Sequence, residues 1–160
     1  MSIKQFNCKY SLSDDRIIFR FNTIDHSEYV FWLTRRVTHI ILKSTSRFFE
    51  NEYKNATPSV ENVISEIQQA DKQATNFTKA YEPGAQYPMG GETLLVMDVK
   101  CNSMKIEGQD IFSLDFILPG GSNLNLKLTV PVMKALIMLL EEANVHAKWG
   151  NPAGTLHLLG

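Results

Sequence analysis

The chain has 160 residues, of which 44% are hydrophobic and 21% are charged, and its formal net charge at pH 7 is −1. These values are typical of globular proteins and exclude a disordered or fibrous chain, and the length suits one compact domain of about 100–200 residues. A net charge near zero argues against binding dominated by nucleic-acid or membrane electrostatics. No apolar run approaches the ~18–20 residues of a membrane span and no secretory signal is visible, so we expect a cytoplasmic protein.

Alternating apolar residues predict three strands in the first third of the chain, at residues 5–12, 16–22 and 28–33. Thr34 follows the third strand and suits a helix N-cap, because its hydroxyl can accept from the free amides of the first helical turn. An apolar stripe at helical spacing then predicts a helix from Arg35 to about Tyr53.

A second helix is predicted in the middle of the chain, beginning near Pro58 and ending at about Tyr81. Residues 82–92 are rich in proline and glycine and give the strongest linker signal in the chain. The final third again predicts strands, at residues 93–101, 111–118 and 123–128. Thr129 then caps a largely apolar helix that ends near Ala147, and an apolar strand is expected over 155–159.

The first and last thirds repeat one pattern, since residues 15–49 align without a gap on residues 110–144, an offset of 95 positions. The apolar series Ile17, Phe19 and Phe21 coincides with Phe112, Leu114 and Phe116. We therefore predict an α+β fold of pseudo-duplicated β-β-β-α units, with antiparallel sheets that each bury one face under their own helix, and an inserted helix between the copies. The expected boundaries are 1–81 for the first copy and the insert, 82–92 for the linker and 93–160 for the second copy, together forming one compact domain.

No residue pattern in the sequence indicates catalysis, and we expect a protein that is not an enzyme. Cys8 and Cys101 lie in predicted strands and are interpreted as reduced core residues, since free cysteine is among the most buried residue types. The four histidines are far apart and none has a neighbour at metal-ligand spacing. We therefore predict no catalytic residues, no metal and no cofactor.

The two predicted hairpins differ on the face that points away from the core. The first hairpin offers Ile18, Arg20, Val30 and Trp32, whereas the equivalent positions of the second are Ser113, Asp115, Asn125 and Lys127. The sequence therefore predicts that the outer face of the second hairpin is solvated. The apolar side chains on the outer face of the first hairpin must be covered by another group. Three covers are possible: the inserted helix, a partner protein, or stacked nucleobases.

A basic stripe is predicted on the first helix, where Arg36, His39, Lys43 and Arg47 are spaced three and four residues apart. Such a stripe can follow a row of phosphates. It can equally be a solvated face, or it can pair with acidic residues of the inserted helix, namely Glu61, Glu66 and Asp71.

The leading hypothesis is a non-enzymatic module that docks to itself or to a partner protein through Ile18, Arg20, Val30 and Trp32. The apolar C-terminal segment could assist by adding a strand to a neighbouring sheet. The alternative is a single-stranded DNA- or RNA-binding protein that uses Arg16, Arg20, Trp32, Arg36, Lys43 and Arg47. In topology alone the duplicated strand-then-helix order is similar to that of the Whirly and Pur-type single-strand binders, and no residue is carried over from them.

Overall fold

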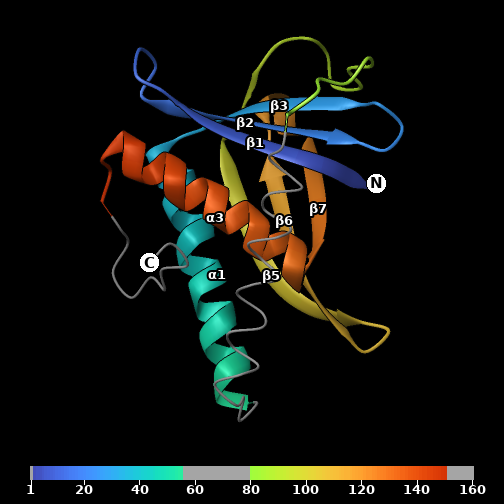
Figure 1. Ribbon diagram of the computed structural model, residues 1–160, viewed down its shortest axis with the longest axis vertical. Helices are drawn as coiled ribbons and strands as arrows, with labels where there is room; N and C mark the ends of the chain where they lie inside the picture. Colours follow the sequence, from blue (N-terminus) through green and yellow to red (C-terminus); the bar gives the residue numbers. More distant parts are fainter. Residues whose placement is uncertain (1, 56–79, 151–160) are drawn as a thin grey trace.

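A computed structural model describes residues 2–55 and 80–150, with the side chains of 51–55 left out. In this part of the chain two sheets, mainly antiparallel, combine with two long helices (Figure 1), so the fold class is α+β, as predicted. The first sheet has the spatial order β1 (Ile3–Ser11), β2 (Arg16–Thr23), β3 (Glu28–Leu33) and β4 (Leu94–Leu95). The second sheet has the order β5 (Asp98–Ile106), β6 (Gln109–Ile117) and β7 (Asn123–Thr129). The helices are α1 (Arg35–Asn55) and α3 (Val130–Ala147), and the short 3-10 turn η1 (Pro119–Gly121) precedes β7.

The chain passes from one sheet to the other within a few residues. Leu94 and Leu95 pair in parallel with β3, and the amide of Val96 donates to the carbonyl of Trp32 at 3.0 Å. The next amide, that of Met97, donates to Ile117 of the second sheet at 2.8 Å. The single strand predicted over 93–101 is therefore wrong, because a continuous apolar run does not reveal that its two ends pair with different sheets.

The two sheets share the same strand register. In the first sheet Ile17 pairs with Leu33, and 95 residues later Phe112 pairs with Leu128; the remaining pairs of β2 with β3 recur in β6 and β7 at the same offset. The common origin of the two halves stays a prediction, but the repeated pairing places side chains of the two halves at comparable positions.

The inner faces of the two sheets meet in a common cluster of buried hydrophobic residues. The ring of Phe116 lies edge-on to Phe19 at 6.0 Å and to Phe31 at 5.5 Å, measured between ring centroids. The cluster also includes residues of both helices, such as Val37 and Leu136. Aromatic rings packed edge to face contribute beyond the area that they bury.

The helices are partly exchanged between the sheets. α1 packs on β5, the first strand of the second sheet, and α3 packs on β1, the first strand of the first sheet, while it also contacts β6 and β7 of its own sheet. The prediction that each sheet buries one face under its own helix is therefore wrong for the first sheet, where the described helical contact comes from α3. Helical periodicity identifies the apolar side of a helix but does not say which sheet receives it.

The helix starts are close to their predicted places. The Thr34 hydroxyl accepts from the amide of Val37 at 3.3 Å, which confirms the predicted N-cap of α1. Thr129 occupies the N-cap position of α3 as predicted, but its side chain makes no capping hydrogen bond. The predicted inserted helix, apart from its last two residues, and the predicted strand at 155–159 lie outside the described residues.

Candidate interaction surface

The outer face of the first sheet brings the four predicted contact residues together. Ile18 pairs with Trp32 and Arg20 pairs with Val30, so the four side chains lie on one face, opposite the buried side chains of the inner face. All four are half-buried. β4 adds Leu95, which pairs with Trp32 and is also half-buried. We call these five residues the outer patch.

Two hydrogen-bond donors of the outer patch have no acceptor in the described part of the chain. The guanidinium of Arg20 makes neither an ion pair nor a hydrogen bond with any described residue, and the indole N–H of Trp32 donates to none. Glu28 is the acidic residue of β3 on this same face, but its carboxylate already accepts from the Tyr81 hydroxyl and from the amide of Gly84. The polar groups of the outer patch are therefore hydrogen-bond donors.

One end of the same face is covered by residues 80–86, which we call the strap. The side-chain amide of Asn22 donates to the carbonyl of Glu82 at 2.6 Å, and the side-chain oxygen of Gln5 accepts from the amide of Glu82 at 3.1 Å. Backbone hydrogen bonds fasten the strap to the hairpin as well, since the amide of Ala85 donates to His26 at 2.8 Å. The predicted linker thus begins as an anchored segment that borders the outer patch.

Glu28 is the buried centre of this attachment, with only 2% of its surface exposed. One carboxylate oxygen accepts from the amide of Gly84 at 2.7 Å, and the other accepts from the hydroxyl of Tyr81. Burial, followed by the hydrogen bond to Glu28, raises the pKa of Tyr81 and keeps its hydroxyl a donor. A Cβ atom on Gly84 would lie 2.6 Å from the carbonyl oxygen of His26, so the strap approaches the hairpin more closely than any other residue type allows.

The outer face of the second sheet is polar, as expected from the sequence. Asn125 and Lys127 are exposed and Asp115 is half-exposed, and Ser113, in the central strand, is buried. The side-chain amide of Asn125 donates to the Ser113 hydroxyl at 2.8 Å. The polar groups of this face form hydrogen bonds with one another or reach water. The apolar side chains of the outer patch can form no hydrogen bonds.

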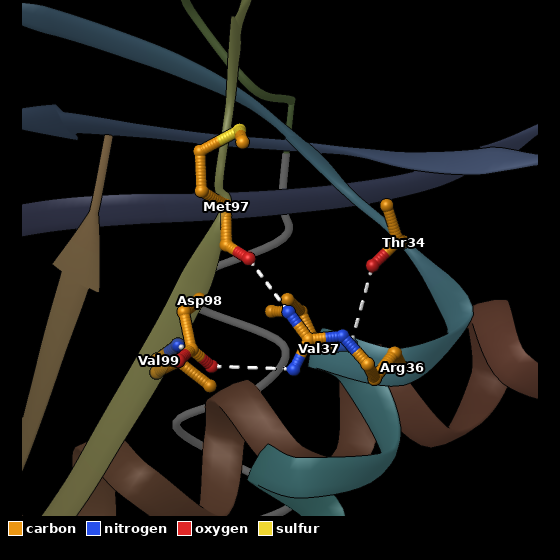
Figure 2. A network of polar contacts seen from close by, with 6 residues as sticks. All are labelled: Thr34, Arg36, Val37, Met97, Asp98 and Val99. Carbon is orange, nitrogen blue, oxygen red and sulfur yellow. Dashed lines mark hydrogen bonds and ion pairs between the residues drawn. The ribbon is translucent and has the colours of Figure 1, made fainter. Parts of the chain in front are cut away.

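The first residue of the basic stripe, Arg36, holds the point where the chain changes sheets (Figure 2). Its guanidinium donates to the carbonyl of Met97 at 2.6 Å and to the carboxylate of Asp98 at 3.3 Å. The same carboxylate oxygen accepts from the amide of Val99 at 2.9 Å. Arg36 therefore joins the start of α1 to the start of β5. The acidic partners considered in the sequence, Glu61, Glu66 and Asp71, lie outside the described residues.

The rest of the stripe is divided between the fold and the solvent. His39 shares a hydrogen bond with the side-chain oxygen of Asn144 at 3.1 Å, which joins α1 to α3. Lys43 and Arg47 are exposed and have no ion pair among the described residues. Both belong to α1, which Figure 1 shows running away from the first sheet. Arg16, the remaining predicted nucleic-acid contact, is half-buried in β2.

The turn between β1 and β2 is tied to the end of α3 by an exposed carboxylate. Asp15 accepts from the hydroxyl of Tyr10 at 2.6 Å and from the indole N–H of Trp149 at 3.0 Å. These two hydrogen bonds, with a smaller contribution from the charge of Arg35, hold the pKa of Asp15 below its ordinary value of 3.8. Asp15 therefore links β1 to the end of α3.

The cysteines occupy equivalent positions, because Cys8 pairs with Phe19 and Cys101 pairs with Leu114, the residue 95 positions after Phe19. Burial raises the pKa of both thiols, so neither is an activated nucleophile. Among the described side chains, no three of His, Cys, Asp or Glu gather as a metal site would require.

A hollow of about 370 Å³ lies beside the β2–β3 turn and is lined by Ser2, Thr23, Ile24, Asp25 and Tyr29. Its carboxylate, Asp25, accepts from the Thr23 hydroxyl, and this hydrogen bond lowers the pKa of Asp25. The acid in the hollow is therefore engaged in the structure of the turn.

No described helix has the length and hydropathy required to cross a membrane. The chain matches no protein-family model, and neither the curated proteins nor the solved structures contain a significant match to it.

Proposed function

We propose that this chain is a non-enzymatic, cytoplasmic binding and assembly module, which docks to another protein chain, either a partner or a second copy, through the outer patch. One observation carries the proposal: the half-buried side chains of Ile18, Val30 and Trp32 lie side by side on the outer face. The equivalent positions of the second sheet hold Ser113, Asn125 and Lys127. Removing apolar surface from water stabilises a contact by about 25 cal/mol per Å². A central tryptophan with an arginine beside it is a frequent composition for the residues that dominate a protein interface.

The geometry gives less support to single-stranded nucleic-acid binding. That function needs a groove in which several cations follow the phosphates beside stacking aromatic side chains. Arg36 and His39 instead form hydrogen bonds within the fold, and Lys43 and Arg47 lie along a helix that leaves the first sheet. The nucleic-acid reading therefore remains the alternative that the experiment must distinguish.

The proposal is tested by affinity purification of the tagged full chain from native extract, with half of the sample treated with nuclease. We expect a stoichiometric protein, or an untagged copy, that survives the nuclease and is lost from Trp32→Ala. Lys127→Ala is the matched control, because Lys127 occupies the equivalent position of the second sheet and is exposed. Circular dichroism and a thermal melt confirm that each variant is folded.

Ile18→Thr supplies a second test should Trp32→Ala fail to fold, since it removes a smaller apolar group from the same patch. Companions that disappear after nuclease treatment, with bound nucleic acid recovered instead, would overturn the proposal in favour of strand binding.

A further inference from the structure

The outer patch contains two donors and no free acceptor, which restricts what can cover it. Arg20 has no acidic partner in the described part of the chain, and neither does the neighbouring Lys9 of β1, which pairs with Ile18. Glu28, on the same face, forms no ion pair with Arg20, and its two oxygens accept from Tyr81 and Gly84 instead. Among the described residues, the exposed part of this face therefore combines apolar surface with two cationic groups that form no ion pair.

A surface that buries Ile18, Val30 and Trp32 also comes against Arg20, because Arg20 lies beside Ile18 on β2 and opposite Val30 on β3. Burying a guanidinium without a partner is costly, and a carboxylate that meets it with a charge-assisted hydrogen bond removes that cost. The occupant must therefore bring an acidic group at the position of Arg20, with apolar groups around it.

We infer that the outer patch receives a segment of a different protein, in which an acidic residue is flanked by apolar residues and pairs with Arg20. This inference rests on the proposed docking function and specifies its partner. A second copy fits less well, since a two-fold contact between identical patches would bring Arg20 toward Arg20 with no acid in either patch. A nucleic-acid strand fits less well, since Arg36 and His39 are held within the fold.

The experiment selects binders from a random peptide library displayed on phage, with the immobilised full chain as target and a random single-stranded DNA library in parallel. We expect peptides that carry Asp or Glu between apolar residues. A synthetic peptide with the selected sequence should bind wild type and the control Lys127→Met equally, and Arg20→Met about tenfold to hundredfold more weakly, the loss expected for one hydrogen bond to a charged group. Replacing the acidic residue of the peptide by its amide should cause a similar loss.

A charge exchange makes the test independent of any general weakening of the fold. Arg20→Glu should reject the acidic peptide and recover binding to a peptide with lysine at the acidic position, which a merely misfolded variant would not do.

Four outcomes would overturn the inference. Apolar peptides with no acidic preference, lost in Trp32→Ala, would remove the inference and leave the docking function standing. A Trp32-dependent dimer in analytical ultracentrifugation, with no peptide selected, would identify the occupant as a second copy. Selection of DNA alone, or of nothing by a monomeric protein, would overturn both the inference and the docking function.

Discussion

The two sheets of this chain agree on their inner faces and differ on their outer faces. The pairs Ile18–Trp32 and Ser113–Lys127 occupy equivalent register positions, yet the first pair is apolar and the second polar. The inner residues are constrained because Phe19, Phe31 and Phe116 pack against one another. The outer residues are not constrained by the common core, and the difference between the two outer faces is the observation on which the proposed docking function rests.

The largest predicted effect on stability comes from disrupting the core that the two inner faces share. Phe116→Ala should lower the free energy of unfolding by about 3–5 kcal/mol, because it removes a fully buried ring and leaves a cavity between the sheets. Urea unfolding monitored by circular dichroism measures the loss. Hydrogen exchange should show β2 and β6 opening together, and two separate transitions would mean that the sheets are independent.

A second prediction concerns the strap, which is attached to the first sheet. Gly84→Ala should cost about 1–3 kcal/mol, because the new Cβ atom would lie 2.6 Å from the His26 carbonyl and 2.9 Å from the amide of Glu28. The change should also speed hydrogen exchange of the Gly84 amide. Gly91→Ala is the matched control, since nothing lies within 4 Å of its Cβ position, and it should change stability by less than about 0.5 kcal/mol. Equal effects of the two variants would show that the strap is not held against the hairpin.

The junction between the sheets gives a smaller effect. Arg36→Ala should lower the free energy of unfolding by about 1 kcal/mol or less, because the pair with Asp98 is largely exposed, at 61% and 53% for the two side chains. The hydrogen bond to the Met97 carbonyl supplies part of this loss. Lys43→Ala on the same helix is the control and should have almost no effect in urea unfolding. A much larger loss in Arg36→Ala would mean that the crossing depends on this one side chain.

The smallest predicted effect concerns the response to acid of the turn between β1 and β2, which carries Asp15. The pKa of Asp15 is lowered in the folded state, so its contribution to stability is present above the ordinary value of 3.8 and is lost as the pH falls through the lower folded value. Asp15→Asn should therefore flatten the fall in melting temperature over that range. Trp149 fluorescence should report the same titration, and Tyr10→Phe should give an intermediate slope. An unchanged slope in Asp15→Asn would show that the hydrogen bonds of Asp15 contribute nothing to stability.

Much of the fold could be predicted from local sequence. Period-two alternation located β2 and β3 within a residue, and the Thr34 cap placed the start of α1. The exchange of the helices could not be predicted, because an apolar stripe carries no information about which sheet it contacts. The crossing at Val96 was missed for a related reason, since pairing partners are set by the tertiary structure.

The candidate surface was predictable in its central residues and not at its borders. Alternation was sufficient to place Ile18, Arg20, Val30 and Trp32 on one face. Leu95 and the strap reach that face from distant parts of the sequence, so no local pattern could associate them with it. The proline and glycine content of residues 82–92 suggested a linker, although Gly84 in fact serves a close backbone contact.

The exchange of the helices has a consequence for how the protein is made. β1 receives its helical cover from α3, which lies far downstream, so the first sheet leaves the ribosome long before the helix that shields it. During that interval Phe6 and Phe19, both buried in the finished fold, lack part of their final packing. The packing of the first sheet therefore cannot be completed until α3 has been synthesised.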